Sequence, residues 1–238
     1  MEVNDLVVKI YADGAELQGI IEISKNPFVK GFTTNPTLMR KAGITDYKKF
    51  ALEVLHAIPD RPISFEVFSD DFEEMYDQAI EIASWGDNVN IKVPVTNTKN
   101  EFAGNLITRL SDKGVFVNVT ALMTLQQVND VMNCLKGDAP AYISVFAGRI
   151  ADTGRDPMPI MTEAAAISRQ RPNTEIIWAS PRELLNIFQA NEAGVQIITV
   201  ANDILGKLSL VGKDLGAYSL DTVKMFRNDA LKAGYSIG

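Results

Sequence analysis

VNIKVPV, residues 89–95, and VFVNVTA, residues 115–121, are the two stretches that decide the fold. Each is a short run rich in β-branched residues, and residues 101–112 between them have the composition of a helix. A strand, a helix and a second strand in this order predict two parallel strands joined by a helical crossover. The same unit recurs in both directions along the chain, eight times in all.

The other units extend this pattern toward both ends of the sequence. Strands are predicted at 7–12, 30–35, 62–68, 89–95, 115–121, 141–146, 175–180 and 195–200, with helices between them that include 71–85, 101–112, 124–135, 160–169 and 182–191. Regular alternation over 238 residues predicts an α/β protein, a single (β/α)8 TIM barrel domain spanning residues 1–238. A doubly wound open sheet is the alternative, but the first strand leads into ADGAEL (12–17) rather than into a glycine-rich phosphate loop.

Two segments follow the last predicted strand. Residues 202–210 are expected to close the barrel, and residues 220–231 to form an extra C-terminal helix. The apolar side chains of that helix fall on one face, at Leu220, Val223, Phe226 and Ala230. A stripe of this kind can pack on its own barrel or on a neighbouring molecule.

The composition excludes several classes of function. A formal net charge of −7 disfavours nucleic acid or an anionic membrane as a partner, and a phosphorylated substrate would need a local basic pocket. One cysteine, Cys134, and one histidine, His56, do not suffice for a zinc site of several His or Cys ligands, so no metal is expected. Without a secretory signal or a membrane-spanning run, a cytoplasmic location is expected.

Alternate residues of the central strands separate into an apolar and a polar series. In 89–95 the aliphatic series suits the helix layer, and the opposite series, Asn90, Lys92 and Pro94, faces the barrel interior. The neighbouring strands place further polar residues on the same inner face: Ser64, Glu66, Asn118, Thr120 and Ser144. An interior that only packs would not need these side chains, so they indicate a polar site.

Lys92 is the residue on which the functional interpretation depends. One alternative is a surface lysine, but its neighbours Ile91 and Val93 have the pattern of a buried strand. A second alternative is a structural ion pair with Glu66. The functional interpretation is a desolvated amine that attacks a carbonyl as a neutral nucleophile. The other polar residues of the inner face would then supply an acid or base and groups that bind hydroxyls.

The carboxyl ends of the strands add a second set of polar residues. Asp13 follows the first strand and Asn35 the second, where catalytic groups of a barrel are found. Thr34 and Pro36 beside them are interpreted as turn and helix-capping residues. A candidate phosphate site follows the sixth and seventh strands, with Arg149, Ser180 and Arg182.

These motifs resemble those of the transaldolase family, including its short bacterial members, over nearly the whole chain. The motifs are ADGAEL (12–17), GFTTNPTL (31–38), SFEVF (64–68), IKVPVT (91–96), VNVTAL (117–122), ISVFAGRIAD (143–152) and WASPREL (178–184). The family implies a transferase of the pentose phosphate pathway that forms a lysine Schiff base without metal or cofactor. It moves a dihydroxyacetone unit from sedoheptulose 7-phosphate or fructose 6-phosphate to glyceraldehyde 3-phosphate or erythrose 4-phosphate.

The resemblance also implies a role for each matching residue. Lys92 is the nucleophile, Glu66 and Thr120 hold the water that moves protons, and Asp13 handles the proton of the C4 hydroxyl. The residues expected to contact the sugar are Thr33, Asn35, Ser64, Asn118, Ser144 and Phe146. Those expected to bind phosphate are Arg149, Ser180 and Arg182. Short members of the family form rings of five that can pair into ten, so a homo-oligomer is expected.

Fructose 6-phosphate aldolase, which releases free dihydroxyacetone, is the close alternative. Those aldolases are similar to this chain but carry glutamine at the position of Glu66 and tyrosine at that of Phe146. A site without that phenol has fewer proton donors near the enamine, which favours transfer over release. An alternative of another class is a non-catalytic barrel that binds a sugar phosphate, and the full set of polar residues disfavours it.

Overall fold

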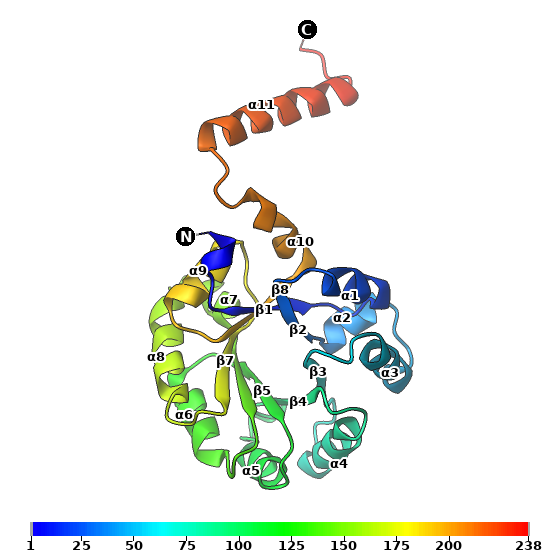
Figure 1. Cartoon of the computed structure of the whole chain (residues 1–238), viewed down its shortest axis with the longest axis vertical. Helices are drawn as coiled ribbons and strands as arrows, with labels where there is room; N and C mark the ends of the chain where they lie inside the picture. Colours follow the sequence, from blue (N-terminus) through cyan, green and yellow to red (C-terminus); the bar gives the residue numbers. More distant parts are fainter. Residues whose placement is uncertain (1, 238) are drawn as a thin grey trace.

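The computed structural model describes residues 2–237, and its strands close into a barrel (Figure 1). The parallel strands are β1 (Lys9–Asp13), β2 (Val29–Thr33), β3 (Ile63–Glu66), β4 (Val89–Pro94), β5 (Val117–Leu122), β6 (Ala141–Val145), β7 (Thr174–Trp178) and β8 (Ile197–Ala201). Each strand pairs with the next along the chain, and β8 pairs with β1. The predicted (β/α)8 barrel with an extra C-terminal helix is confirmed.

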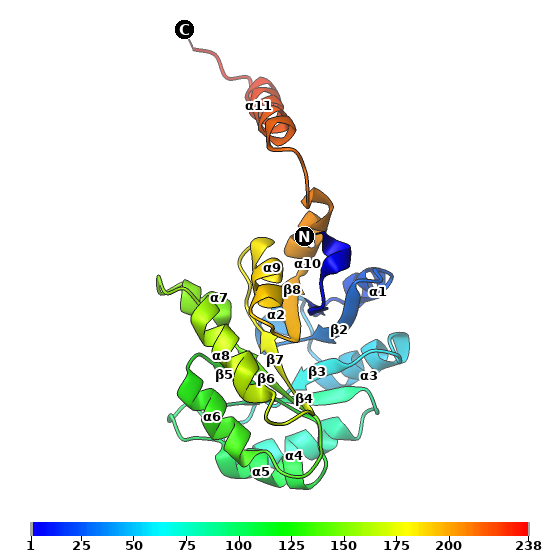
Figure 2. The same ribbon diagram turned by 60° about the vertical axis from the view of Figure 1, so that its left-hand side comes forward.

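Helices surround the barrel on its outside (Figures 1 and 2). They are α1 (Leu17–Ser24), α2 (Pro36–Lys41), α3 (Tyr47–Ala57), α4 (Phe72–Ala83), α5 (Gly104–Asp112), α6 (Leu125–Cys134), α7 (Ala147–Ala151), α8 (Met158–Ser168), α9 (Leu185–Glu192) and α10 (Asn202–Leu205). The segment predicted at 202–210 is divided between α10 and a 3-10 helix, Gly206–Leu210, and another short 3-10 turn, Val3–Asp5, precedes β1. Side-chain caps fix several helix starts, for example Asp71 on α4 and Thr124 on α6.

The aliphatic side of each strand packs against the helices, as its alternation predicts. Ile91, Val93 and Val119 are fully buried there. Burying one such side chain contributes about 1.5–3 kcal/mol, so this layer is a large part of what stabilises the barrel. Because successive strand residues point to opposite faces, fixing the aliphatic residues outward also fixes Lys92 and Thr120 inward.

The lower part of the barrel interior is closed by apolar and aromatic side chains. Tyr11, Tyr142, Ile177 and Ile197 form a buried cluster with Phe116 packed against it. The two tyrosine hydroxyls lie 2.7 Å apart, and burial raises the pKa of Tyr142 to about 12, so this phenol stays protonated at neutral pH. Two residues further along these strands stand Asp13, Ser144 and Thr199, on the same face. The cluster therefore lies directly beneath the polar residues, and we call it the floor of the barrel interior.

Glycine is needed at one position of this floor. Gly31 of β2 faces the ring of Tyr11, and a Cβ at Gly31 would lie 2.6 Å from the ring carbons. Such a contact is far inside van der Waals separation, so a side chain at this position would displace Tyr11. We attribute the glycine of GFTTNP to this close approach rather than to backbone conformation.

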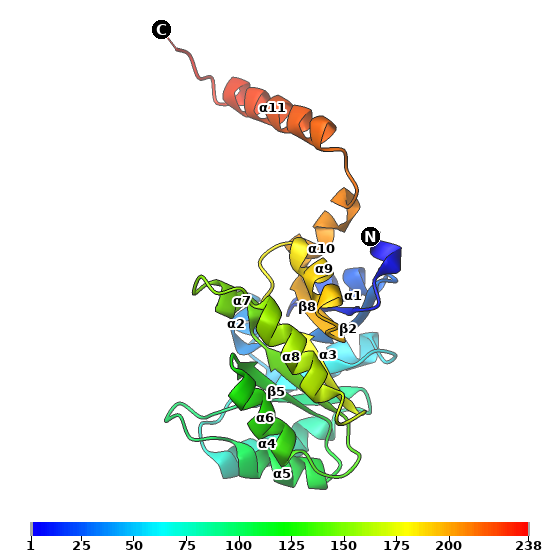
Figure 3. The same cartoon turned by 90° about the vertical axis from the view of Figure 1, so that its left-hand side faces the viewer.

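The C-terminal helix α11 (Leu215–Lys232) stands away from the barrel in all three views (Figures 1–3). It is longer than the predicted 220–231 and has no buried residue. Leu220, Val223 and Phe226 are exposed by 53%, 60% and 63%. Within residues 2–237, none of the helices has both the length and the apolar character needed to cross a membrane.

Candidate active site

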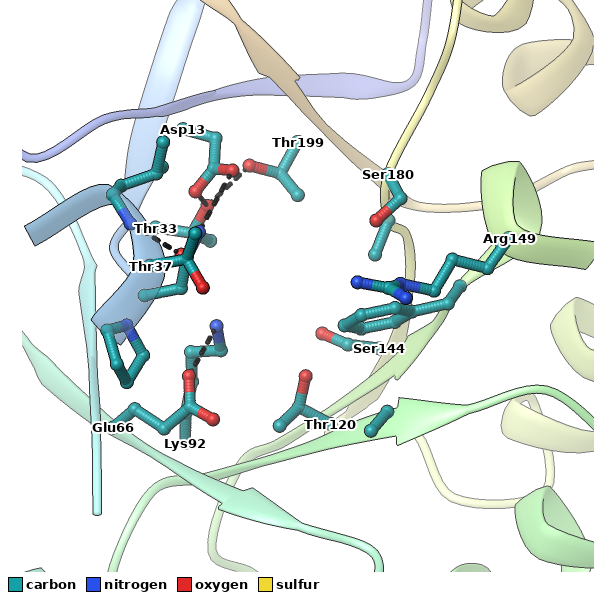
Figure 4. A pocket seen from close by; sticks show the side chains of 16 residues that line it. Asp13, Thr33, Thr37, Glu66, Lys92, Thr120, Ser144, Arg149, Ser180 and Thr199 are labelled. Atoms are coloured by element: carbon teal, nitrogen blue, oxygen red, sulfur yellow. Dashed lines mark hydrogen bonds and ion pairs between the residues drawn. The ribbon is translucent and has the colours of Figure 1, made fainter. Parts of the chain in front are cut away.

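A pocket of about 490 Å³ opens at the carboxyl ends of the strands (Figure 4). Its volume is within the range of pockets that enclose small molecules. Predicted site residues that line it are Asp13, Thr33, Asn35, Glu66, Lys92, Thr120, Ser144, Phe146, Arg149 and Ser180. The structure thus brings together residues from strands and loops across the whole chain.

Lys92 reaches this pocket from β4 and is largely buried. The strand register places it beside Glu66 of β3, and its Nζ lies 3.0 Å from Glu66 Oε2. The amine also donates to the backbone carbonyl oxygen of Thr34 at 2.9 Å. The Lys92 side chain is 9% exposed and that of Glu66 18%, so the ion pair is well shielded from water. The pair holds the amine at the base of the pocket.

The backbone of Glu66 is itself fixed by a tyrosine from α3. The hydroxyl of Tyr47 donates to the Glu66 carbonyl oxygen at 2.8 Å and accepts from the Glu66 N–H at 2.8 Å. The ring of Tyr47 packs edge-on against Phe65 and Phe68. These two hydrogen bonds fix the backbone at the end of β3, and with it the direction in which the Glu66 side chain leaves the strand.

Asp13 stands at the opposite side of the pocket from Arg149 and Ser180 (Figure 4). Its Oδ1 accepts from Thr33 Oγ1 at 2.8 Å, and its Oδ2 faces Asn35 Nδ2 at 3.4 Å. Burial raises the pKa of the Asp13 carboxyl, an effect that the charge of Lys92 and these two hydrogen bonds only partly offset. A carboxyl of this kind is suited to taking up a proton and returning it.

Asn35 has a structural role besides facing the pocket. It is the N-cap of α2, and its Oδ1 accepts from the N–H of Leu38 at 3.0 Å, with Pro36 in the first helical turn. The amide nitrogen is thereby turned toward Asp13. The capping role predicted for Thr34 belongs to Asn35 instead, because Thr34 is fully buried and donates its hydroxyl to the Ser64 carbonyl oxygen.

A chain of buried hydrogen bonds crosses the barrel beneath the pocket. Ser144 Oγ donates to Asn118 Oδ1 at 2.7 Å, and Asn118 Nδ2 donates to Ser64 Oγ at 3.1 Å. Ser64 in turn donates to Asn90 Oδ1. Asn118 and Ser64 have no exposed surface, so the structure places them under the pocket rather than in its wall. Above them, the hydroxyl of Thr120 is buried and has no partner among the described residues.

The far side of the pocket is basic. The guanidinium of Arg149, from α7, extends into the pocket next to Ser180 and lies 5.8 Å from the ring centroid of Phe146 (Figure 4). Arg182 does not line the pocket. It is held by Asp152, whose Oδ1 accepts from Arg182 Nε at 2.9 Å and whose Oδ2 accepts from Nη2. This contact lowers the pKa of the Asp152 carboxyl.

Two close features of the backbone shape this basic side. Gly148 of α7 packs directly on the loop after β7, and a Cβ there would overlap the carbonyl oxygen of Ser180. Ser180 and Ala121, both in the pocket wall, have φ values of 56° and 68°. Left-handed backbone at non-glycine residues costs free energy and tends to occur at functional sites. In β5 the strand register also shifts between Val119 and Leu122, which turns Ala121 toward the pocket.

Comparisons with known proteins agree with this geometry. The profile of the family described as Transaldolase/Fructose-6-phosphate aldolase matches residues 10–236. A probable transaldolase of Dehalococcoides mccartyi is 35% identical over 199 residues, which are 83% of this chain and 88% of that protein. The chain belongs to the transaldolase/fructose-6-phosphate aldolase family. It is therefore an enzyme, as the sequence predicts.

Other relatives of this family extend the comparison. A probable transaldolase of Methanococcus maripaludis is 33% identical over 84% of this chain and 89% of that protein. One of Nitrosopumilus maritimus is 32% identical over 84% and 87%. A solved structure of a putative phosphonomutase from Burkholderia cenocepacia aligns with a TM-score of 0.59 at 10% identity, covering 93% of this chain and 94% of that one. That likeness concerns the barrel fold alone.

Sequence reasoning missed three residues of the candidate site. Thr199 and Thr37 line the pocket, and Tyr47 holds Glu66 from behind. Thr199 had a usable signal, since it is the polar member near the carboxyl end of the strand predicted at 195–200. Tyr47 had none, because its role depends on how α3 packs against β3.

Within residues 2–237, no three His, Cys, Asp or Glu side chains gather closely enough to hold a metal ion.

Proposed function

We propose that this enzyme is a transaldolase that moves a dihydroxyacetone unit between sugar phosphates through a Schiff base on Lys92. The observation that carries the proposal is a buried lysine amine, 3.0 Å from a carboxylate, inside a pocket with an arginine on its far side. The donors proposed are sedoheptulose 7-phosphate and fructose 6-phosphate, and the acceptors are erythrose 4-phosphate and glyceraldehyde 3-phosphate. A relative's name at 35% identity supports the reaction class.

Imine formation requires a neutral amine and a route for protons. Glu66 is the carboxylate in contact with Lys92, so it accepts the amine proton before attack. The nitrogen lone pair then bonds to C2 of the ketose, and Glu66 passes its proton to the former carbonyl oxygen. Glu66 then removes a second proton from the nitrogen and passes it to the same oxygen, which departs as water and leaves an iminium that keeps the third amine hydrogen. We assign the holding of this water to Thr120, which lines the pocket and whose hydroxyl has no hydrogen-bond partner among the described residues.

Carbon–carbon cleavage uses the iminium as its electron sink. Asp13 takes the proton of the C4 hydroxyl, the C4 oxygen becomes an aldehyde, and the C3–C4 bond breaks. The bonding electrons move to the C2–C3 bond, which gives an enamine on Lys92. An acceptor aldehyde is attacked by C3, Asp13 returns the proton to the new hydroxyl, and water hydrolyses the imine. Because the iminium supplies the sink, this route requires no metal or cofactor.

The remaining pocket residues would bind the two ends of the sugar. We assign the dihydroxyacetone end to Thr33, Asn35, Ser144 and Phe146, all of which line the pocket. Ser64 and Asn118 would support this end from below, because they are buried and hydrogen-bonded to each other. For the phosphate we assign Arg149 and Ser180 as direct ligands, with Arg182 as an outer one that Asp152 holds in place.

Transfer is favoured over aldol release by what surrounds the enamine. The side chain that follows β6 is Phe146, which carries no proton donor, and no tyrosine lines the pocket in the part of the chain that the structure describes. An enamine that is not protonated at C3 waits for an acceptor aldehyde. Fructose 6-phosphate aldolase, the other activity in the family's description, is the second candidate.

The test is turnover with and without an acceptor. With fructose 6-phosphate alone, we expect about one equivalent of glyceraldehyde 3-phosphate per site, followed by a stall. Adding erythrose 4-phosphate should restore turnover, with sedoheptulose 7-phosphate as the product, and Lys92→Ala should do neither. Free dihydroxyacetone accumulating at the transfer rate without an acceptor would instead identify an aldolase. A wild-type protein that binds the sugar phosphate without any reaction would identify a binding barrel.

The exposed stripe of α11 supports a further part of the proposal, a homo-oligomer in which α11 docks on another copy, in a pentamer or decamer. Its apolar residues Val223 and Phe226 are exposed, so the described part of the barrel does not cover them. Light scattering of Phe226→Glu should show a smaller particle than the wild type, whereas Lys224→Glu on the same helix should not. A monomeric wild type at micromolar concentration would refute assembly. We also propose the cytoplasmic location that the sequence predicts.

A further inference from the structure

Thr199 of β8 is a pocket residue to which neither the motifs nor the proposed mechanism assigns a task. It is 8% exposed, and its Oγ1 lies 2.6 Å from Oγ1 of Thr33. Thr33 Oγ1 in turn lies 2.8 Å from Asp13 Oδ1. The three residues come from three adjacent strands at the place where the barrel closes, because β1 pairs with both β8 and β2. Figure 4 shows the group at one side of the pocket.

The number of available hydrogen atoms determines which residue donates each hydrogen bond in this group. An ionised carboxylate only accepts hydrogen bonds, and a threonine hydroxyl has one hydrogen to donate. Thr33 donates that hydrogen to Asp13 Oδ1, so the hydrogen between the two threonines must come from Thr199. The order is therefore Thr199 to Thr33 to Asp13. Hydrogen bonds in series polarise one another, so the first donor strengthens the second.

The same order distinguishes the two oxygens of Asp13. Oδ1 accepts the short bond from Thr33, whereas the only donor given to Oδ2 by the described residues, Asn35 Nδ2, is at 3.4 Å. A bond of that length is weak. Oδ2 is thus the oxygen left with free lone pairs, and it is the one able to receive a proton from a substrate hydroxyl.

From this geometry we infer that Thr199 is a positioning residue for the reaction: its hydroxyl orients that of Thr33, which stabilises ionised Asp13 at Oδ1 and leaves Oδ2 to exchange the substrate proton. The inference rests on the proposed function, in which Asp13 is the base of carbon–carbon cleavage. Thr199 does not touch the reacting atoms in this scheme, and it acts only through Thr33.

The charges around Asp13 determine the expected pH effect. Burial within the barrel raises the pKa of Asp13 most, Lys92 of β4 and the bonds from Thr33 and Asn35 lower it, and Glu66 of β3 raises it. Losing the Thr199 donor weakens the bond from Thr33 and removes part of what favours the ionised form. The pKa of Asp13 should then rise further, and the acid limb of the pH profile should move to higher pH.

The experiment compares Thr199→Val with Thr199→Ser. Valine keeps the shape of threonine and lacks its hydroxyl, whereas serine keeps the hydroxyl and is the matched rescue. We expect Thr199→Val to lower kcat for transfer by about fivefold, the loss from one neutral hydrogen bond, with KM nearly unchanged and the acid limb shifted upward. Thr199→Ser should restore both kcat and the pH profile. An unchanged pH profile in Thr199→Val would overturn the inference, as would a serine variant as impaired as the valine variant.

A double-mutant cycle tests whether the effect passes through Thr33. In a Thr33→Val background, Thr199→Val should cause no further loss of kcat, because the relay is already broken. Additive losses would contradict the relay. If Thr199→Val is poorly folded by circular dichroism, Thr199→Ala replaces it in the same cycle. Failure of the proposed function would look different, since the wild type itself would then show neither transfer nor a borohydride-trapped adduct.

Discussion

Replacing Arg149 with alanine should separate phosphate binding from sugar chemistry. Its guanidinium extends into the pocket, and within residues 2–237 Lys92 is the only other lysine or arginine in the pocket wall. A chain with a net charge of −7 repels a phosphorylated sugar, so this local cation has to supply the attraction. A hydrogen bond to a charged group contributes about 1.5–3 kcal/mol, which corresponds to a KM increase of about 10- to 150-fold.

Arg182 gives a smaller effect by the same reasoning. Two of its donors are already used by Asp152, and its side chain is 49% exposed. A screened and partly neutralised charge of this kind contributes at most about 1 kcal/mol, so Arg182→Ala should raise KM by no more than about fivefold. The structure therefore predicts an order, with Arg149 before Arg182, that the sequence motifs do not give.

The assay measures initial rates of transfer to erythrose 4-phosphate at a saturating concentration, with fructose 6-phosphate as donor and with unphosphorylated fructose as the comparison donor. Arg149→Ala should raise KM for fructose 6-phosphate and leave that for fructose nearly unchanged. Arg155→Ala is the matched control, because Arg155 is an exposed arginine outside the pocket. Equal losses on both substrates, or an effect of Arg155→Ala as large as that of Arg149→Ala, would refute the assignment.

Three further predictions follow from the other side of the pocket and from the residue after β6. Glu66→Gln should lower kcat by about 10²- to 10⁴-fold in the transfer assay, because the amide cannot accept the amine proton; an unchanged kcat would make Glu66 a structural partner only. Asp13→Asn should abolish transfer yet raise the melting temperature at pH 7. Burial raises the pKa of this carboxyl, so its stabilising contribution is present at low pH and lost as pH rises through the folded-state pKa; the difference in melting temperature between variant and wild type should shrink in acid, and a constant difference would contradict it. Phe146→Tyr should increase free dihydroxyacetone relative to transfer product, since it adds a proton donor in the pocket wall; an unchanged product ratio would show that residue 146 does not control the outcome.

The alternation of strands and helices was enough to predict the barrel and the inward direction of its polar residues. Ile91 and Val93 are apolar and must face the helices, so Lys92 between them had to face inward. The same argument applies to Thr120 and Ser144, which do line the pocket. These predictions succeeded because residue alternation is a local property of a regular strand, and it is interrupted where the register shifts, as at Ala121.

The sequence did not predict how deep in the barrel each inward-facing residue lies, or which residues from different loops contact each other. Asn118 and Ser64 face inward as predicted, but the stagger of neighbouring strands decides that they lie below the pocket. Arg182 and Asp152 come from loops after different strands, and their contact depends on how closely Gly148 allows α7 to approach the loop after β7. Distances between segments that are far apart in the sequence cannot be inferred from a local residue pattern.

The central claim is that Lys92 forms a covalent imine with the substrate, and borohydride trapping tests it most directly. Fructose 6-phosphate is added to the wild type, to Lys92→Ala and to Lys99→Ala, whose lysine lies outside the pocket, and borohydride reduces any imine to a stable amine. Mass spectrometry of the digested proteins should find the adduct on the peptide that contains Lys92, in the wild type and Lys99→Ala only. An adduct on the Lys92→Ala protein, or a wild type that turns over without any trapped adduct, would contradict the account.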